Sequence, residues 1–151
     1  PERSADEGRG LDAAIEEARI GRSEGASPIG ASLMIDGGVV GRGHNRRVQS
    51  GSAILNGETD CLENAGRRHA ADYRRATLYT TLSPCDMCTG AALLYGIPRI
   101  VIGENETFMG AEAYLESRGV ELVRANDPQC VEMMTEFIAA EPELWNEDIG
   151  E

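Results

Sequence analysis

The chain has 151 residues, of which 41% are hydrophobic, and this is enough to build one domain around a single core. Its formal net charge is −12 at pH 7, and all 14 basic residues are arginine. The absence of lysine excludes a lysine Schiff base and a Walker-type phosphate site, and the acidic balance disfavours nucleic acid as a partner. We therefore predict one domain over residues 1–151.

No apolar run reaches the roughly 18 residues that span a bilayer, so we expect no membrane partner. The polar start, Pro1–Gly10, has neither a secretory nor a transit pattern. A soluble protein of the cytoplasm is the resulting expectation. The chain has 4 cysteines and is long enough to fold without disulfides. Of these, Cys61 and Cys130 are expected to be ordinary buried thiols.

The predicted elements begin with a helix over Leu11–Glu24, whose apolar residues recur at helical spacing. Asp36-Gly37-Gly38 then predicts a hairpin turn between strands Ala31–Ile35 and Val39–Gly43. The alternation continues with a helix over Gly57–His69, a strand over Ala76–Leu82, a helix over Asp86–Tyr95, a strand over Arg99–Ile102, and the segments Ala111–Arg118, Val120–Val123 and Pro128–Ala139, the last with Asp127 as its N-cap. Strands alternating with helices predict a layered α/β domain whose sheet is covered on both faces.

Two short motifs, each at the start of a predicted helix, carry the chemistry. Asn56-Gly57-Glu58 and Pro84-Cys85-Asp86-Met87-Cys88 match the zinc deaminase pattern H-x-E…P-C-x-x-C, with Asn56 in the place of the histidine. The spacing of Cys85 and Cys88 puts both thiols on one helical face, and a helix N-terminus favours their thiolate forms. The pattern predicts a catalytic Zn²⁺ held by Asn56, Cys85 and Cys88, with Glu58 as the proton carrier. A thioredoxin-type redox pair is the alternative reading of C-x-x-C, but Asn-x-Glu upstream favours metal.

Asn56 is the unusual residue of this pattern. An amide oxygen is a harder and weaker donor for Zn²⁺ than an imidazole nitrogen. If the replaced histidine binds through Nδ1, Oδ1 of Asn56 lies equally far from Cβ and can reach the same place. Three alternatives stay open: Asn56 binds the metal, it is deamidated to Asp because Gly57 follows, or the change inactivates the site. The two histidines, His44 and His69, are not expected to replace the missing ligand.

Several further stretches extend the match over nearly the whole chain. They are Pro28-Ile29-Gly30, Gly41-Arg42-Gly43-His44-Asn45, Leu62-Glu63-Asn64, the run from Leu78 to Ala91, Tyr95-Gly96-Ile97-Pro98-Arg99, Gly103-Glu104-Asn105, and the end from Glu147 to Glu151. With these residues the chain resembles the fungal-type cytosine deaminases, small homodimeric zinc enzymes of the cytidine deaminase superfamily. The resemblance implies a three-layer α/β/α sandwich around a five-stranded mixed sheet, a homodimer, and one Zn²⁺ per subunit.

The resemblance also implies which residues contact a pyrimidine base. Asn45 would bind the carbonyl edge of the base and Asp148 would accept from its exocyclic amine. Phe108 and Trp145 would close over the ring. The remaining implied contacts are polar at the Gly57 amide and the Ser83 carbonyl and apolar at Ile29 and Leu82. The chain departs from the family pattern at Asn56 and at Asn146, where an aromatic residue is expected near the pocket lid.

The implied activity is the hydrolysis of cytosine to uracil and ammonia in pyrimidine salvage, on a small nucleobase-like substrate. Two alternatives stay open. One keeps the reaction and changes the ring, to isocytosine, guanine, creatinine or a triazine, because one hydrogen-bonding group can reverse selectivity. The other is a non-catalytic relative that lost activity with the histidine. The retained Glu58 favours an enzyme.

Overall fold

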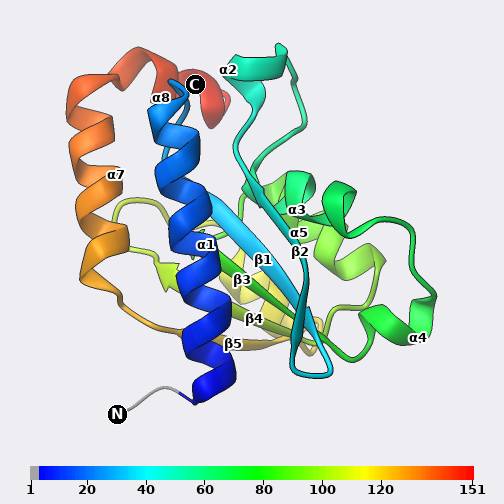
Figure 1. Cartoon of the computed structure of the whole chain (residues 1–151). Helices are drawn as coiled ribbons and strands as arrows, with labels where there is room; N and C mark the ends of the chain where they lie inside the picture. Colours follow the sequence, from blue (N-terminus) through cyan, green and yellow to red (C-terminus); the bar gives the residue numbers. More distant parts are fainter. Residues whose placement is uncertain (1–3) are drawn as a thin grey trace.

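The computed structural model describes residues 4–151, which form a five-stranded sheet between two layers of helices (Figure 1). The strands are β1 (Gly30–Ile35), β2 (Gly38–His44), β3 (Ala76–Leu82), β4 (Arg99–Glu104) and β5 (Glu121–Arg124). The helices are α1 (Ala5–Ser23), α2 (Arg47–Ser50), α3 (Gly57–Ala65), α4 (Ala70–Tyr73), α5 (Asp86–Leu94), α6 (Glu112–Ser117), α7 (Pro128–Ala140) and α8 (Pro142–Asp148).

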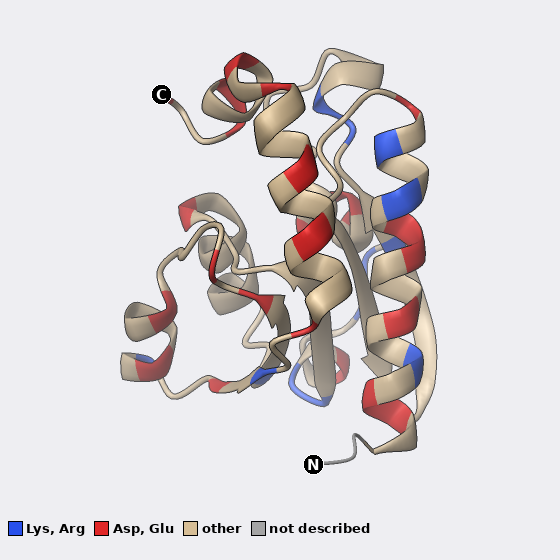
Figure 2. Ribbon diagram, turned by 90° about the vertical axis from the view of Figure 1, so that its left-hand side faces the viewer, with Lys and Arg blue, Asp and Glu red and all other residues tan. Residues whose placement is uncertain are grey.

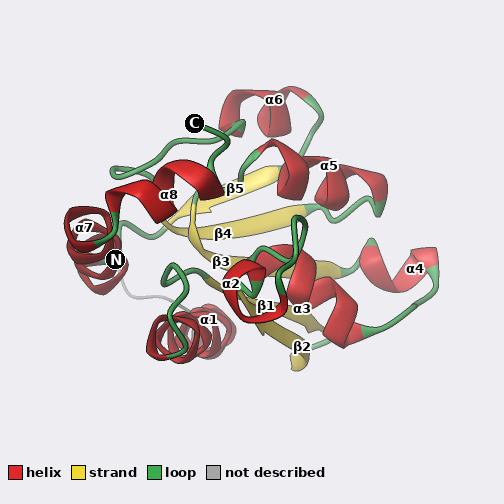
Figure 3. Cartoon of the chain, turned by 90° about the horizontal axis from the view of Figure 1, so that it is seen from above, coloured by secondary structure: helices red, strands yellow, loops and turns green. Residues whose placement is uncertain are grey.

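The sheet has the strand order β2-β1-β3-β4-β5. Strand β1 is antiparallel to both β2 and β3, whereas β3, β4 and β5 run parallel. Seen from above, α1 and α7 lie on one side of the sheet and α3 and α5 on the other (Figure 3). This arrangement confirms the predicted three-layer α/β/α sandwich with a mixed sheet.

Each face of the sheet has its own apolar core because side chains alternate along a strand. On the side of α3 and α5, Leu33, Leu78 and Ile100 are buried together with Cys61. On the side of α1 and α7, the buried side chains are Leu11, Ala14, Ile15, Met34, Tyr79, Val101 and Cys130. Cys61 and Cys130 are buried thiols, as predicted, and they lie on opposite sides of the sheet.

The structure confirms two local predictions, the hairpin turn at Asp36-Gly37 and the N-cap at Asp127. Asp36 and Gly37 form the β1–β2 turn with φ of 51° and 81°, the left-handed conformations that a type I′ turn requires. Asp127 caps α7 by accepting hydrogen bonds from the amides of Gln129 at 2.8 Å and Cys130 at 3.3 Å. These features hold the hairpin and the last long helix in place.

The helix predicted over Gly57–His69 is too long. It ends at Ala65, because Gly66 takes a φ of 79° and turns the chain away, and a separate short helix, α4, begins after His69. Helix α1 begins earlier than predicted, with Ser4 as its N-cap. Helices α2 and α8 were not among the predicted elements.

Acidic residues lie along α1 and α7, and α1 also carries arginines (Figure 2). Within residues 4–151, no helix combines the length and the apolar character needed to cross a membrane.

Candidate active site

The two sequence motifs meet because each begins a helix on the same face of the sheet. Asn56 immediately precedes α3 and Cys85 immediately precedes α5. A small cavity between these helix ends is lined by Ile29, Asn45, Asn56, Glu58, Leu82, Ser83, Cys85, Phe108, Trp145, Asp148 and Ile149. Most of the residues predicted for the site thus surround one space.

Gly57 and Cys88 are the predicted site residues that do not line this cavity. Gly57 lies against Ile29, with the carbonyl oxygen of Ile29 only 3.0 Å from the place of an added Cβ. Cys88 is buried one helical turn behind Cys85. Ile149 lines the cavity without having been predicted, although it belongs to the terminal run that supported the family resemblance.

The Asn56 amide faces both sulfur atoms of the second motif. Its Nδ2 atom lies 3.3 Å from Sγ of Cys85 and 3.6 Å from Sγ of Cys88. A half-turn about the Cβ–Cγ bond exchanges the amide nitrogen and oxygen with almost no change of shape. The position facing both sulfurs can therefore hold either a hydrogen-bond donor or an oxygen ligand.

This donor set can be compared with the needs of zinc. Within residues 4–151, no group of three or more His, Cys, Asp and Glu side chains is arranged to hold a metal ion. Asn56 has an amide in reach of both thiols, and an amide oxygen can serve as a third protein ligand. Two thiolates and one oxygen are donor types that zinc accepts, so the residues fit the ion with a weaker third ligand than imidazole.

The two thiols have different acidities. A hydrogen bond from Cys88, supported by the backbone amides of Cys88 and Met87 and by Asn56, lowers the pKa of Cys85 to about 6 against the opposing effect of burial. The pKa of Cys88 is raised, because its thiol donates to Cys85 and is buried. Cys85 is therefore the thiolate of the pair at neutral pH, as a helix N-terminus favours.

Glu58 carries a buried carboxyl group, with 3% of the residue exposed. Burial and the nearby negative charge of Cys85 raise the pKa of Glu58 to about 8, while hydrogen bonds from its own amide, Cys88 and Thr80 act in the opposite direction. A carboxyl with this pKa can both hold and release a proton near neutral pH, as general acid–base catalysis requires.

The opposite part of the cavity is polar and hydrogen-bonded. Asn45 donates through Nδ2 to the Ser27 hydroxyl at 3.0 Å and accepts at Oδ1 from the Arg47 amide at 2.9 Å. Asp148 accepts from Nη1 of Arg47 at 2.9 Å. Burial raises the pKa of Asp148, and Ser27 and Arg47 counteract the rise. Arg47, on the unpredicted helix α2, is the residue here that sequence reasoning missed.

The apolar wall comes from the C-terminal helices. Trp145 on α8 is packed with Leu82, Met134 and Phe137, and Phe108 and Ile149 border the same cluster. The Phe108 ring stands edge-on to Trp145, with ring centroids 5.8 Å apart. Helix α8 thus brings both Trp145 and Asp148 to the cavity. Asn146 is exposed and does not line it, so the departure at this position lies outside the cavity.

Neither histidine belongs to the site. Both ring nitrogens of His44 lie 2.8 Å from carboxylates of α1 and its end, Nδ1 from Glu17 and Nε2 from Glu24. His69 precedes α4.

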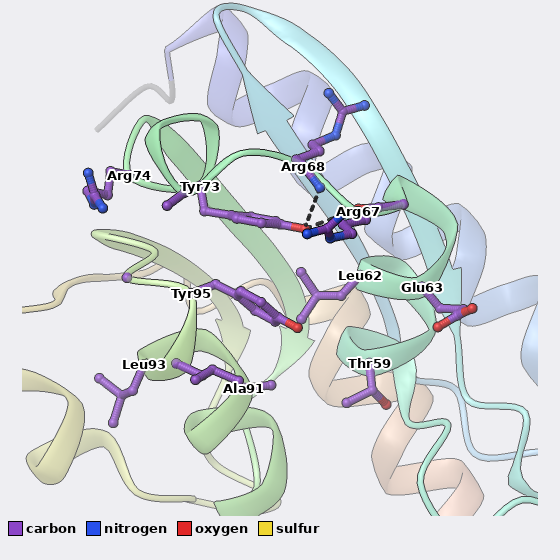
Figure 4. A pocket seen from close by; sticks show the side chains of 14 residues that line it. Thr59, Leu62, Glu63, Arg67, Arg68, Tyr73, Arg74, Ala91, Leu93 and Tyr95 are labelled. Atoms are coloured by element: carbon purple, nitrogen blue, oxygen red, sulfur yellow. Dashed lines mark hydrogen bonds between the residues drawn. The ribbon is translucent and has the colours of Figure 1, made fainter.

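A larger groove of about 810 Å³ lies between α3, α4 and α5 (Figure 4), and its lining does not include Glu58, Cys85 or Asn56.

Comparison with known proteins identifies the family of the chain. Residues 5–104 match the family model of the cytidine and deoxycytidylate deaminase zinc-binding region. The chain is 52% identical to a cytosine deaminase of Candida albicans over 97% of this chain and 98% of that protein. It is 37% identical to a tRNA-specific adenosine deaminase of Streptococcus pyogenes, over 66% of this chain and 64% of that protein.

Solved structures show the same fold. A structure of the guanine deaminase from Nitrosomonas europaea superimposes with a TM-score of 0.75 at 22% identity, over 92% of this chain and 87% of that one. A structure from work on tRNA:A34 deaminases gives a TM-score of 0.72 at 24% identity, over 83% of this chain and 99% of that one.

Proposed function

The chain belongs to the family defined by the cytidine and deoxycytidylate deaminase zinc-binding region, and from this we propose that it hydrolyses cytosine to uracil and ammonia. One observation of the structure carries the proposal. A single small cavity contains a proton-holding carboxyl (Glu58), a thiolate (Cys85) and the polar side chains of Asn45 and Asp148. The 52% identity to a cytosine deaminase over nearly the whole chain supports this ring over others.

We assign one Zn²⁺ per chain to Asn56, Cys85 and Cys88. When bound, zinc lowers the pKa of water, so that a nucleophile is available near neutral pH. Asn56 would turn its amide oxygen toward the place that Nδ2 holds beside both sulfurs. The site then keeps the open fourth position of a catalytic zinc centre.

Glu58 is assigned to move the protons. In the reaction, the bond between the ring carbon and the amine breaks and a carbon–oxygen bond forms. Of the two protons that the water gives up, one ends on the ring nitrogen and the other on the departing ammonia. A buried carboxyl beside both cysteines is placed to carry each proton in turn.

The remaining cavity residues are assigned to hold the base. Asn45 would bind the carbonyl edge and Asp148 the exocyclic amine, as the polar network between them and Ser27 allows. Phe108 and Trp145 would close over the ring. The list of assigned contacts is completed by the Gly57 amide, the Ser83 carbonyl, and the apolar side chains of Ile29 and Leu82. A flat ring between apolar walls, fixed by a few polar groups, is a typical ligand arrangement.

A free base fits this chain better than nucleic acid, although some relatives are tRNA deaminases. The chain has 26 acidic residues against 14 basic ones, and a phosphate backbone binds to basic surfaces. A free nucleobase as substrate is also consistent with pyrimidine salvage in the cytoplasm.

Zinc-loaded protein should be tested for ammonia release from cytosine, isocytosine, guanine, creatinine and a triazine. We expect release from cytosine, with loss on chelation and recovery on adding zinc. Release from another ring alone would replace cytosine by that ring. No release from any of them, with zinc bound, would favour the non-catalytic relative and contradict the proposal.

We further propose that the chain is a homodimer joined through α5. The outer face of α5 presents Met87, Gly90, Ala91 and Leu94 without a charged side chain, and Leu94 is 76% exposed. An added Cβ at Gly90 would contact nothing within 4 Å. An exposed apolar helix face of this kind is typical of a subunit contact.

A further inference from the structure

Two buried carboxylates outside the proposed proton path lie on either side of the loop that carries Phe108. Glu104, at the end of β4, is 1% exposed, and Glu112, at the start of α6, is 2% exposed. A buried charge is costly unless other groups pair with it and donate hydrogen bonds to it. The partners of these two groups therefore show what the buried charges stabilise.

The partners of Glu112 come from three separate segments. Its Oε2 atom accepts a hydrogen bond from the Ser83 hydroxyl at 2.6 Å. Its Oε1 atom accepts from Nε of Arg124, on β5, at 2.8 Å and from Nδ2 of Asn105 at 3.2 Å. Charge-assisted hydrogen bonds of this kind are about twice as strong as neutral ones. Glu112 thus connects β5 and the Phe108 loop to the segment that leads into Cys85.

Ser83 extends this connection to the far end of the loop. Its hydroxyl oxygen accepts a hydrogen bond from the Gly110 amide at 2.9 Å. The backbone of Gly110 is so close to the turn before α5 that an added Cβ would lie 1.8 Å from the Pro84 carbonyl oxygen. Since Cys85 follows Pro84 directly, the loop and the thiolate-bearing turn are held in contact.

Glu104 fixes the first half of the same loop. Its Oε2 atom accepts from the amides of Glu106 at 2.7 Å and Thr107 at 3.0 Å, and its other oxygen accepts from the Thr107 hydroxyl. Phe108 comes next in the chain. The ring that packs on Trp145 is therefore anchored on one side by Glu104 and on the other by the Glu112–Ser83 pair.

We infer that Glu112 is a positioning residue of the active site. Paired with Arg124, its carboxylate holds the Ser83 hydroxyl, and through it keeps the Phe108 loop seated on the turn that carries Cys85. The inference rests on the proposed function for its effect on turnover. Its effect on the position of Phe108 can be measured without substrate.

The test compares Glu112→Gln and Ser83→Ala with a matched control, Glu116→Gln. Glu116 lies on the same helix and pairs with the same arginine at 3.1 Å, but it is exposed and does not contact Ser83. Trp145 is the single tryptophan of the chain, so acrylamide quenching of its fluorescence reports how well Phe108 covers it. The far-ultraviolet spectrum and melting temperature of each variant establish that it is folded at the assay temperature.

We expect quenching to increase in Glu112→Gln and Ser83→Ala and to stay at the wild-type level in Glu116→Gln. For cytosine, kcat/KM should fall by up to about 100-fold in the first two variants, because a displacement of about 1 Å in an active site can have an effect of this size. Wild-type quenching and kcat/KM in folded Glu112→Gln would overturn the inference and leave Glu112 a purely stabilising residue. Equal effects in Glu116→Gln, or an effect of Glu112→Gln without one of Ser83→Ala, would overturn it too. If the wild-type protein releases no ammonia, the proposed function fails, and quenching alone still decides the positioning role.

Discussion

Replacing Arg47 by Met removes the cation that faces Asp148 in the cavity. Nη1 of Arg47 lies 2.9 Å from Oδ1 of Asp148, and the two side chains are 24% and 6% exposed. Removing one partner of a fully buried ion pair costs about 3–5 kcal/mol, whereas an exposed pair contributes about 0–1 kcal/mol. Because Arg47 keeps partial access to water, we expect a loss of about 2 kcal/mol, which lowers Tm by about 4–8 °C in a chain of this size.

The loss should depend on pH with a definite sign. Burial raises the pKa of Asp148, and Arg47 counteracts that rise. In Arg47→Met the native pKa rises further, so the native state binds this proton more tightly than the unfolded chain does. The difference in the free energy of unfolding between wild type and Arg47→Met is therefore small near the ordinary aspartate pKa of 3.8. This difference grows as the pH rises toward neutrality.

Thermal melts of Arg47→Met and wild type over a series of pH values check this reasoning. Arg75→Met is the matched control, because it removes an arginine from an exposed pair with Asp36 at 3.0 Å, and its cost should stay below about 1 kcal/mol at every pH. The assigned pairing would be refuted if Arg47→Met lost no more stability than Arg75→Met, or if its loss of stability became smaller as the pH rises. The KM for cytosine should also rise, since a protonated Asp148 accepts the substrate amine less well.

The other predictions concern the proton carrier and the subunit contact. Glu58→Gln should retain zinc and lose turnover by about 100- to 10,000-fold, the range measured for general acid–base groups; turnover near the wild-type rate in steady-state ammonia assays would exclude Glu58 from that role. Leu94→Glu should convert the dimer to a monomer in analytical ultracentrifugation, while Val39→Glu, at another exposed apolar position, should leave it a dimer. A wild-type monomer, or a dimer of Leu94→Glu, would contradict the α5 contact.

The helix starts at the two motifs could be predicted from the sequence because they depend on neighbouring residues only. A helix N-terminus follows from the residue types around Asn56 and Pro84, and the spacing of Cys85 and Cys88 places both thiols on one turn. The family resemblance implied a five-stranded mixed sheet, but neither it nor any periodicity in the chain was used to predict the strand order β2-β1-β3-β4-β5.

Other parts of the site have no local signal. Helix α8 has only 7 residues and begins directly after α7, so its apolar positions form no stripe that can be counted. The contact of Arg47 with Asp148 joins residues 101 positions apart, and that of Ser83 with Glu112 joins residues 29 apart. Gly66 also shows how one glycine with a positive φ can end a helix that was predicted to continue to His69.

We propose above all that the Asn56 amide completes a zinc site with Cys85 and Cys88. A competitive zinc titration against a chromophoric chelator tests it on three proteins: wild type, Asn56→Ala and Asn56→His. We expect one zinc per wild-type chain, at least about tenfold weaker binding in Asn56→Ala, and tighter binding in Asn56→His. Equal affinities in wild type and Asn56→Ala would show that the amide is not a ligand and would contradict the account.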